Sequence, residues 1–250
     1  MGGVTVMAVT DHDTTAACAE VMQLAHAGGI DAVGGIEITA VAEARDVHVL
    51  GYFIDPDDTA LAAFLLRQRT NRVERLEAMG ARLAELGMPV DAAAIVERGR
   101  RDANRSIGRP QLARAMVDAG HVRDTREAFD KWLIEGRPAF VPRTGAAVED
   151  VIDIIHRAGG IASIAHPGKT CRMDDRLPAL RAAGLDALEV FHPDHDAAAV
   201  VRYQRVADDL GLLMTGGSDF HGDPGHGLMP GSVTLPQPQW ERLVQRRGIR

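Results

Sequence analysis

Histidine and carboxylate side chains recur in five short segments of this sequence, each in or beside an apolar, strand-like run. The segments are Thr10-Asp11-His12-Asp13, Gly35-Ile36-Glu37, Asp46-Val47-His48, Ala165-His166-Pro167 and Gly217-Ser218-Asp219-Phe220-His221. Imidazole nitrogens and carboxylate oxygens, when gathered in one place, can hold several divalent ions around one substrate oxygen. The residue types and their placement therefore predict a metallohydrolase.

The first segment offers His12 as a metal ligand. Asp11 or Asp13 would lie beside it and could orient an imidazole by a hydrogen bond. A competing interpretation is that Asp13 or Thr14 simply caps the helix that follows. Because a helix cap does not require a histidine, the pattern favours metal binding for His12.

Glu37 and His48 are the next candidate ligands. Glu37 follows Gly34-Gly35 in an apolar run, where burying an unpaired carboxylate is costly and a bridging position between two cations would offset that cost. His48 alternates with Val47 and Val49 and therefore points away from them. Taken alone, His48 fits a hydrogen-bonded core histidine better, and only the other candidate ligands favour metal binding for it.

The strongest local pattern is Asp219 and His221, whose one-residue spacing sends both side chains to the same side of an extended segment. His166 comes directly before Pro167-Gly168, a rigid turn after a buried strand. The predicted metal ligands are His12, Glu37, His48, His166, Asp219 and His221.

Catalytic and phosphate-binding roles are predicted for a second group. His192 or His195 could be a metal ligand or a general acid that protonates the leaving oxygen, or else a solvated loop residue. Arg109 and Arg143 could bind phosphate through paired N–H groups, and a surface ion pair is an equal alternative for each. The predicted catalytic residues are His192, His195 and Asp11. The remaining histidines, which have no such neighbours and are expected to be structural, are His26, His121, His156 and His226.

Alternating strands and helices are expected to position these residues. Such alternation is typical of a mostly parallel sheet covered by helices, with the chemistry at the carboxyl ends of the strands. Strands are predicted at residues 4–9, 32–38, 47–53, 161–165, 185–191 and 212–215. Helices are predicted at residues 16–27, 148–155, 177–183 and 197–210.

Residues 59–139 interrupt this alternation. Leu66, Val73, Leu76 and Leu83 mark a long helix rich in Arg and Glu, and shorter helices follow it. We therefore predict a helical insertion over residues 59–139 that covers the site, between two parts of one α/β domain at residues 1–58 and 140–250.

Composition excludes several other classes of protein. With 250 residues, 46% of them hydrophobic, the chain can bury one substantial core. A net charge of -7 argues against binding duplex nucleic acid, although 26 of the 28 basic residues are arginine. Two cysteines, Cys18 and Cys171, are too few for a disulfide framework, and neither a secretion signal nor a membrane span is visible. We therefore expect a cytoplasmic protein with no membrane partner.

Together and in this order, the five segments resemble the PHP family, named for polymerases and histidinol phosphatases. The resemblance covers essentially the whole chain. It implies a distorted (β/α)7 barrel similar to a TIM barrel, and a cluster of two or three divalent ions held by the six predicted ligands. Mn is the metal it favours, with Zn or Fe as alternatives.

The helical insertion refines this resemblance. Gly108-Arg109-Pro110-Gln111-Leu112-Ala113 and the segment from Gly136 to Arg143 are similar to the branch of nucleoside 3',5'-bisphosphate phosphatases and 5'-3' exoribonucleases. The resemblance implies that metal-activated water removes phosphate from nucleotides or short oligonucleotides. Two alternatives are a phosphatase for histidinol phosphate or another small metabolite, and an inactive remnant that serves as a binding module.

One motif of the family is missing from this sequence. Family members begin with a strand ending in His-x-His, followed by a loop Asp, ahead of the segment that matches Val4–Val9. We therefore expect a barrel that lacks its first βα unit, with unpaired strand edges and one weakly bound metal that relies mainly on Glu37 and Asp219. An upstream start codon and a damaged gene copy are the two explanations.

Overall fold

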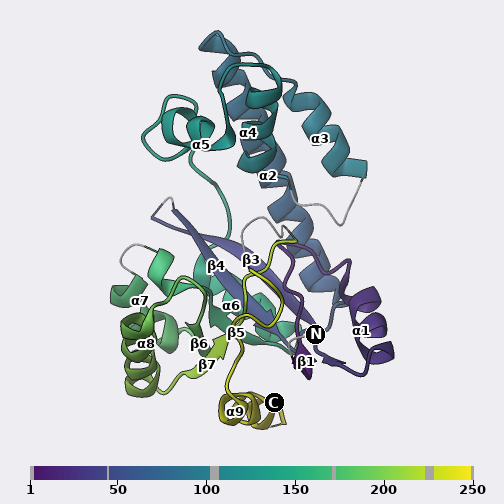
Figure 1. Cartoon of the computed structure of the whole chain (residues 1–250), viewed down its shortest axis with the longest axis vertical. Coiled ribbons are helices and arrows are strands. Elements are labelled where there is room, and N and C mark those ends of the chain that lie inside the picture. Colours follow the sequence, from purple (N-terminus) through teal and green to yellow (C-terminus); the bar gives the residue numbers. More distant parts are fainter. Residues whose placement is uncertain (1–2, 44, 102–106, 171–172, 223–227, 249–250) are drawn as a thin grey trace.

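The structure is a computed structural model and describes residues 3–43, 45–101, 107–170, 173–222 and 228–248. A two-stranded and a five-stranded sheet form its lower part, with helices packed around the larger sheet (Figure 1). The strands are β1 (Val6–Met7), β2 (Asp31–Ala32), β3 (Gly35–Ala42), β4 (Arg45–Tyr52), β5 (Ile161–Ile164), β6 (Ala187–Phe191) and β7 (Leu213–Gly216). The helices of this part are α1 (Cys18–Ala27), α6 (Val148–Arg157), the short 3-10 helix η2 (Pro167–Lys169), α7 (Met173–Ala182), α8 (Ala197–Leu210) and α9 (Gln237–Gly248).

The larger sheet is mixed, whereas the sequence predicted a mostly parallel one. In the order β3-β4-β5-β6-β7, the first two pairings are antiparallel and the last two are parallel. The reason is the short connection between Ala42 and Arg45, where Glu43 has a φ of 51°. So short a connection can only return the chain antiparallel to the strand it leaves. β3 therefore continues beyond its predicted end, and Glu37 lies inside a strand rather than at its carboxyl end.

The second half of the chain follows the predicted alternation of helices and strands. α8 begins after Asp196, whose side chain accepts a hydrogen bond from the Ala199 N–H group, and it ends at Gly211 with a φ of 62°. Helix α6 packs on β3, β4 and β5, and α8 packs on β6 and β7. These helices leave the carboxyl ends of β5, β6 and β7 free to carry His166, His192 and Asp219.

The segment before α1 lies along β3. The Asp13 N–H group donates to the Glu37 carbonyl at 2.9 Å, and the Glu37 N–H group donates to the Asp11 carbonyl at 3.1 Å. His12 and Glu37 thus form a parallel bridge outside the named strands. This pairing brings the first predicted segment directly beside the second.

Helix α1 differs from the sequence expectation at its start. The residue before its first turn is Ala17, and no side chain caps it. Thr14 Oγ1 accepts a hydrogen bond from the Ala16 N–H group, two residues before the helix begins. The alternative that Asp13 or Thr14 caps this helix is therefore wrong.

The helices between β4 and α6 include those of the upper lobe in Figure 1, and the first of them, α2, extends from the lower part into that lobe. They are α2 (Thr59–Glu85), α3 (Ala92–Arg101), α4 (Arg109–Asp118), α5 (Thr125–Ala128) and the π-helix η1 (Phe129–Leu133). Leu76, Leu83, Leu112 and Leu133 are at most 3% exposed and belong to a hydrophobic core of this lobe, which is distinct from the core beneath the sheet. The start of α2 does not belong to this second core, because Leu61, Phe64 and Leu65 pack in the core beneath the sheet. No helix in the described ranges combines the length and the hydropathy needed to cross a membrane.

Candidate functional site

Six imidazole rings form a continuous arc on one side of the larger sheet. They come from His12, His48, His166, His192, His195 and His221. Neighbouring ring centroids are separated by 5.8 Å (His221–His12), 5.1 Å (His12–His48), 5.1 Å (His48–His166), 5.6 Å (His166–His192) and 5.4 Å (His192–His195). All the histidines predicted as ligands or catalysts are therefore brought together, although they are up to 209 positions apart in the chain.

The Glu37 carboxylate lies at the centre of three of these rings. Its Oε1 is 2.6 Å from His48 Nδ1 and 3.5 Å from His166 Nε2, and its Oε2 is 3.7 Å from His12 Nδ1. The Glu37 side chain is only 7% exposed. A buried carboxylate among three imidazoles is suited to bind cations on both of its oxygens.

Strand alternation and register explain this convergence. Ile36 and Ile38 are fully buried in the core below the sheet, so Glu37 points to the opposite face. Glu37 pairs with Leu50 across the hairpin, which places His48 two residues along β4 on the face shared with Glu37. The hairpin, rather than the end of a parallel strand, therefore positions His48.

Two predicted ligands have strained backbone conformations and lie in the loops that follow parallel strands. His166, after β5, has a φ of 27°, and Asp219, after β7, has a φ of 49°. Such values are unfavourable for residues other than glycine and concentrate at functional sites. The His166 N–H group donates to Glu189 Oε2 at 2.7 Å, and this hydrogen bond holds the turn in place.

Electrostatics keep Glu37 ionised. Burial alone raises the pKa of Glu37, but the imidazoles of His166 and His48 outweigh it, and the pKa lies well below the ordinary range. The pKa of His12 is lowered, chiefly by burial, although the charge of Glu37 opposes this shift. An ionised carboxylate and a neutral imidazole are the forms that bind metal.

Three buried imidazole nitrogens have no aligned hydrogen-bond partner among the described residues, and this supports a metal site. Within the described part of the chain, Nδ1 of His12, His48 and His166 makes no hydrogen bond of acceptable alignment. Buried polar atoms are rarely left unsatisfied in folded proteins. Ligand atoms of His12, Glu37 and His48 also lie within 4.8 Å of one another. These residues therefore fit a divalent cation.

Asp219 is a second candidate carboxylate ligand, in addition to Glu37. Its Oδ2 lies 3.2 Å from His192 Nε2 and 3.3 Å from Lys169 Nζ. His221 is 61% exposed, and its Nδ1 lies 2.8 Å from the Asp219 carbonyl, so that Nδ1 donates and Nε2 keeps a free lone pair. Burial raises the pKa of Asp219, but the close His192 ring and the nearby His221 and Lys169 outweigh burial and lower it to about 2.

This lowered pKa predicts a pH-dependent contribution to the stability of the metal-free protein. Ionised Asp219 stabilises the fold above the unfolded-state pKa of about 4, and the contribution is lost as the pH falls to about 2. Urea unfolding, measured at several pH values from about 4 down to about 2, should show that the difference in free energy of unfolding between the wild type and Asp219→Asn becomes smaller. A difference between the two proteins that does not change with pH would contradict this assignment.

His192 is arranged to donate a proton. Its Nδ1 accepts a hydrogen bond from the Asp194 N–H group at 3.1 Å, so in the neutral ring the proton resides on Nε2. This Nε2 is buried and makes no aligned hydrogen bond among the described residues. The geometry is compatible with the predicted general acid and leaves no lone pair on Nε2 for a metal.

His195 occupies a different position. Its Nδ1 lies 2.9 Å from the Val190 carbonyl, and its Nε2 accepts a hydrogen bond from the Gly168 N–H group at 3.4 Å. Both ring nitrogens are thus used by the backbone, and burial lowers the pKa of His195. The geometry favours positioning of the loop after His166 over the predicted catalytic role.

Four arginines and two aspartates lie between the imidazole arc and the helical lobe. Asp13 is fully buried, and its Oδ2 lies 2.5 Å from Arg72 and 3.4 Å from Arg143. Asp46 Oδ2 lies 3.4 Å from Arg109, and it is also approached by Arg75 at 3.8 Å and by Arg143 at 3.9 Å. The four guanidinium groups outnumber the two carboxylates, which leaves a local excess of positive charge.

Both predicted phosphate-binding arginines belong to this arginine cluster. Arg143 is 5% exposed, and burial lowers its pKa to about 10 despite the opposing charges of Asp13 and Asp46. Arg109 is 29% exposed. The ion-pair alternative and the phosphate alternative are therefore compatible, because the aspartates hold the arginines in place without neutralising all of them.

Asp11 is the predicted site residue without a visible function. Its carbonyl pairs with β3, and burial raises the pKa of its carboxyl group. No contact between this carboxyl group and an imidazole occurs among the described residues. Asp13, the alternative to Asp11, contacts arginines instead of a histidine.

Several site residues were missed at the sequence level. They are Asp46, Arg72, Arg75, Lys169 and Glu189. Arg72 and Arg75 lie on one face of α2, but the sequence contains many arginines and gave no reason to select these two. Lys169, three residues after His166, was the most accessible of the five to sequence reasoning.

The histidines expected to be structural lie away from the arc. His156 Nε2 is 2.7 Å from Asp186 Oδ2 near the start of β6, and His121 Nε2 is 2.8 Å from the Pro89 carbonyl in the upper lobe. His26 is exposed on α1. His226 and Cys171 lie outside the described residues.

Comparison with known proteins places this site in context. No family model matches the chain. A 3',5'-nucleoside bisphosphate phosphatase from Chromobacterium violaceum is 36% identical over 252 residues, covering 96% of this chain and 87% of the relative. The 5'-3' exoribonuclease Rnm of Escherichia coli is 31% identical over 221 residues, covering 86% of this chain and 74% of the relative.

A solved structure agrees with these relatives. The crystal structure of a protein described as a metal-dependent phosphoesterase, from Bifidobacterium adolescentis, superposes with a TM-score of 0.84 at 30% identity. The alignment covers 98% of this chain and 86% of that structure.

Proposed function

This chain belongs to the PHP family of metal-dependent phosphoesterases, and from that premise we propose that it hydrolyses phosphate esters of nucleotides or short oligonucleotides. The observation that carries the proposal is the buried Glu37 among three imidazoles, next to an arginine cluster built on Asp13, whose N–H group donates to the Glu37 carbonyl. The imidazoles suit metal, and the arginines suit phosphate.

The metal ligands we propose are those predicted from the sequence. Glu37 would be shared by two ions. The imidazoles of His12, His48 and His166 would also bind these ions, and Asp219 and His221 would bind a further one. When bound, divalent cations supply Lewis-acid polarisation of the phosphoryl group and lower the pKa of water. Imidazole and carboxylate ligands are compatible with Mn, Zn and Fe, and Mn is the one we favour.

The arginine cluster would bind the phosphate group and neutralise its charge. Asp13 and Asp46 fix the guanidinium groups before substrate arrives, so little conformational freedom is lost on binding. On departure of the leaving group, the proton on His192 Nε2 would pass to the ester oxygen. Lys169, beside Asp219, would add a further positive charge.

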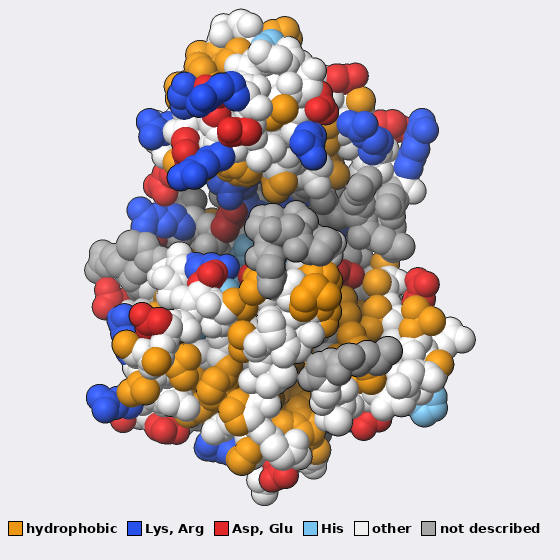
Figure 2. Space-filling model, in the orientation of Figure 1, with side chains coloured by type: hydrophobic (Ala, Val, Ile, Leu, Met, Phe, Trp, Pro, Cys, Tyr) orange, Lys and Arg blue, Asp and Glu red, His pale blue; other side chains and the backbone are white. Residues whose placement is uncertain are grey.

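The charge distribution favours an anionic substrate. Residues 59–139 contain 15 basic and 11 acidic residues, whereas the rest of the chain contains 13 basic and 24 acidic ones. Figure 2 shows basic side chains, with acidic ones among them, on the upper lobe, and a hollow at the junction with the lower part, beside the grey atoms. We propose that this lobe attracts nucleotide phosphates towards the hollow.

We also propose that the two sheets are parts of one distorted barrel. The pairing of residues 11–13 with β3 links β1 and β2 to the larger sheet. In such a barrel, the arc of histidines would lie on the face that the two sheets enclose.

Phosphate release measures the proposed function directly. Purified protein with Mn should release phosphate from a nucleoside 3',5'-bisphosphate, or a mononucleotide from a 5'-phosphorylated dinucleotide, in preference to releasing phosphate from histidinol phosphate. EDTA should abolish the release, and added Mn should restore it. Preference for histidinol phosphate would overturn the nucleotide assignment. Absence of release from every substrate, together with fewer than two bound metals per chain, would instead favour a binding module.

Replacing Arg109 separates phosphate binding from the chemical step. Arg109→Met removes a partly exposed guanidinium from the cluster, and a charge-assisted hydrogen bond contributes about 1.5–3 kcal/mol. We therefore expect KM to rise at least about tenfold, with a smaller change in kcat. Arg114→Met, an exposed position on the same helix, is the matched control and should behave like the wild type. Equal KM values for the two variants would remove Arg109 from the substrate site.

A further inference from the structure

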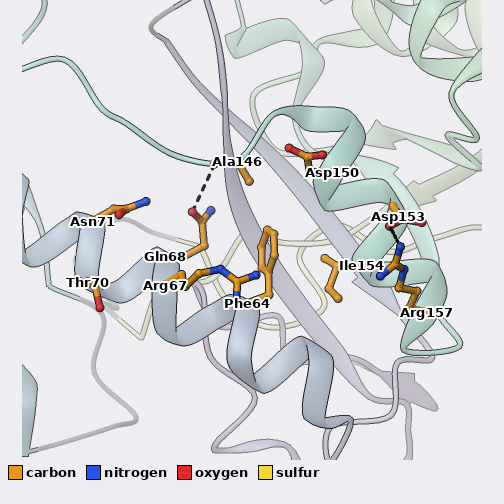
Figure 3. A pocket seen from close by; sticks show the side chains of 10 residues that line it. All are labelled: Phe64, Arg67, Gln68, Thr70, Asn71, Ala146, Asp150, Asp153, Ile154 and Arg157. Carbon is orange, nitrogen blue, oxygen red and sulfur yellow. Dashed lines mark hydrogen bonds and ion pairs between the residues drawn. The ribbon is translucent and has the colours of Figure 1, made fainter.

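A groove between α2 and α6 lies outside the metal site (Figure 3). Its volume is about 530 Å³. Phe64 and Ile154 line it and belong to the core below the sheet, on the face of β3 that carries Ile36 and Ile38. Glu37 points to the opposite face. The groove and the metal centre are therefore separated by the sheet.

The walls of the groove carry few free charges. Arg157 is paired with Asp153 at 2.8 Å on α6. Arg67, on α2, has no ion pair within the described ranges, and its guanidinium lies 5.7 Å from the centre of the Phe64 ring. Asp150 uses one oxygen to accept a hydrogen bond from the backbone at the start of α6. One unpaired guanidinium beside an exposed carboxylate does not suit a ligand with several phosphates.

The side chains that line the groove suit a ligand made of a planar base joined to a sugar with several hydroxyl groups. Guanidinium planes are surfaces on which nucleobases stack, and the exposed Arg67 guanidinium, with the buried Phe64 ring behind it, provides one. The Asn71 side chain has no partner in the described part of the chain, and its amide can both donate to and accept from a base edge. The Asp150 carboxylate can accept hydrogen bonds from ribose hydroxyls, as acidic residues do in dinucleotide sites.

Gln68 connects the groove to the arginine cluster. Its Nε2 donates to the Thr39 carbonyl at 2.8 Å, and its Oε1 accepts from the Ala146 N–H group at 3.4 Å. Thr39 in turn donates its N–H group to Asp13 Oδ1 at 2.9 Å and accepts from Arg72 through its hydroxyl at 2.8 Å. Two hydrogen bonds thus separate a residue that lines the groove from the arginines of the proposed phosphate site.

We propose that this groove is a second, non-catalytic site that binds a free nucleoside, and that its occupancy changes the phosphate affinity of the arginine cluster through Gln68. The choice of a nucleoside rests on the proposed function, since the substrates and products of nucleotide hydrolysis all contain a nucleoside. The change in affinity is reciprocal, so phosphate at the cluster changes nucleoside affinity by the same factor.

Calorimetric titration of the full chain with adenosine, and with ribose as the ligand lacking a base, tests the site without relying on enzymatic turnover. Adenosine should bind in the micromolar to millimolar range, and ribose should not bind detectably. Arg67→Gln and Asn71→Ala should each weaken adenosine binding about fivefold, the scale of a lost stacking or amide contact. Arg98→Gln, an exposed arginine on α3, is the matched control and should leave binding unchanged. No adenosine binding, or equal binding by Arg67→Gln and the wild type, overturns the proposal.

Titration with inorganic phosphate tests whether the groove and the arginine cluster are coupled through Gln68. Saturating adenosine should change the phosphate affinity of the wild type at least about fivefold, the lower end of typical coupling between sites. This change should disappear in Gln68→Met, or in Gln68→Glu if the first variant is unstable, when each variant is titrated at an adenosine concentration that saturates it. An unchanged wild-type phosphate affinity overturns the connection. Both titrations keep their meaning even if no phosphatase activity is found.

Discussion

Replacement of Glu37 by Gln is expected to lower kcat for phosphate release by at least about a thousandfold. The carboxylate is the one acidic group shared by His12, His48 and His166, so its loss removes the anion that would hold cations among them. Metal polarisation contributes several kcal/mol to transition-state stabilisation, and each 1.36 kcal/mol is a factor of ten in rate. The amide has nearly the same size as the carboxylate, which isolates the effect of charge.

Two measurements distinguish this loss from misfolding. Elemental analysis after dialysis should show fewer bound metals per chain in Glu37→Gln than in the wild type. The metal-free variant should melt at a lower temperature than the metal-free wild type, because it loses the contacts of the ionised carboxylate with the imidazoles, and the increase on adding Mn should be smaller in the variant. Glu20→Gln, on the exposed surface of α1, is the control and should retain full activity. Full activity in Glu37→Gln would remove the proposed metal centre.

Replacement of Asp13 by Asn is expected to destabilise the fold by about 3 kcal/mol or more. Asp13 is fully buried and pairs with Arg72 and Arg143, so the variant leaves two guanidinium groups without their shared counter-charge. Removing one partner of a buried ion pair typically costs about 3–5 kcal/mol. Asparagine is chosen because it tolerates the φ of 54° at this position and keeps an acceptor for the Thr39 N–H group.

Urea unfolding measures this difference, and an exposed pair provides the comparison. Asp130→Asn removes the partner of Arg126, where both side chains are largely exposed, and should change the free energy of unfolding by less than about 1 kcal/mol. The double variant Asp13→Asn with Arg143→Met should recover part of the loss, since one unpaired buried charge is then absent. A free energy of unfolding in Asp13→Asn equal to that of Asp130→Asn would show that Asp13 does not stabilise the junction.

The parallel half of the fold followed from local pattern. The turn residues and apolar spacing around α6, β5, β6 and α8 predicted these elements closely, and His166, His192 and Asp219 lie one to three residues after the ends of strands. Short-range rules suffice there because each strand is separated from the next by a helix with clear ends. The first half was less predictable, since two adjacent apolar runs can pair as a hairpin or lie parallel, and apolar spacing is the same in both cases.

The chain by itself determined which side chains are available and which family they match. Six candidate metal ligands, the helical insertion and two of the four clustered arginines were recognisable from residue type, spacing and resemblance. These features depend on local sequence and on the chemistry of single side chains.

Only the tertiary structure decided how these groups are used. The hairpin register brought His48 beside Glu37, the fully buried Asp13 gathered Arg72 and Arg143 from positions 59 and 130 residues away, and backbone hydrogen bonds engaged both nitrogens of His195. Spacing along a chain does not encode such pairings, because they depend on which surfaces meet after the sheet and the helices have packed. Residue types therefore predicted a metallohydrolase, and packing decided which carboxylate is available for metal and which one holds the arginines.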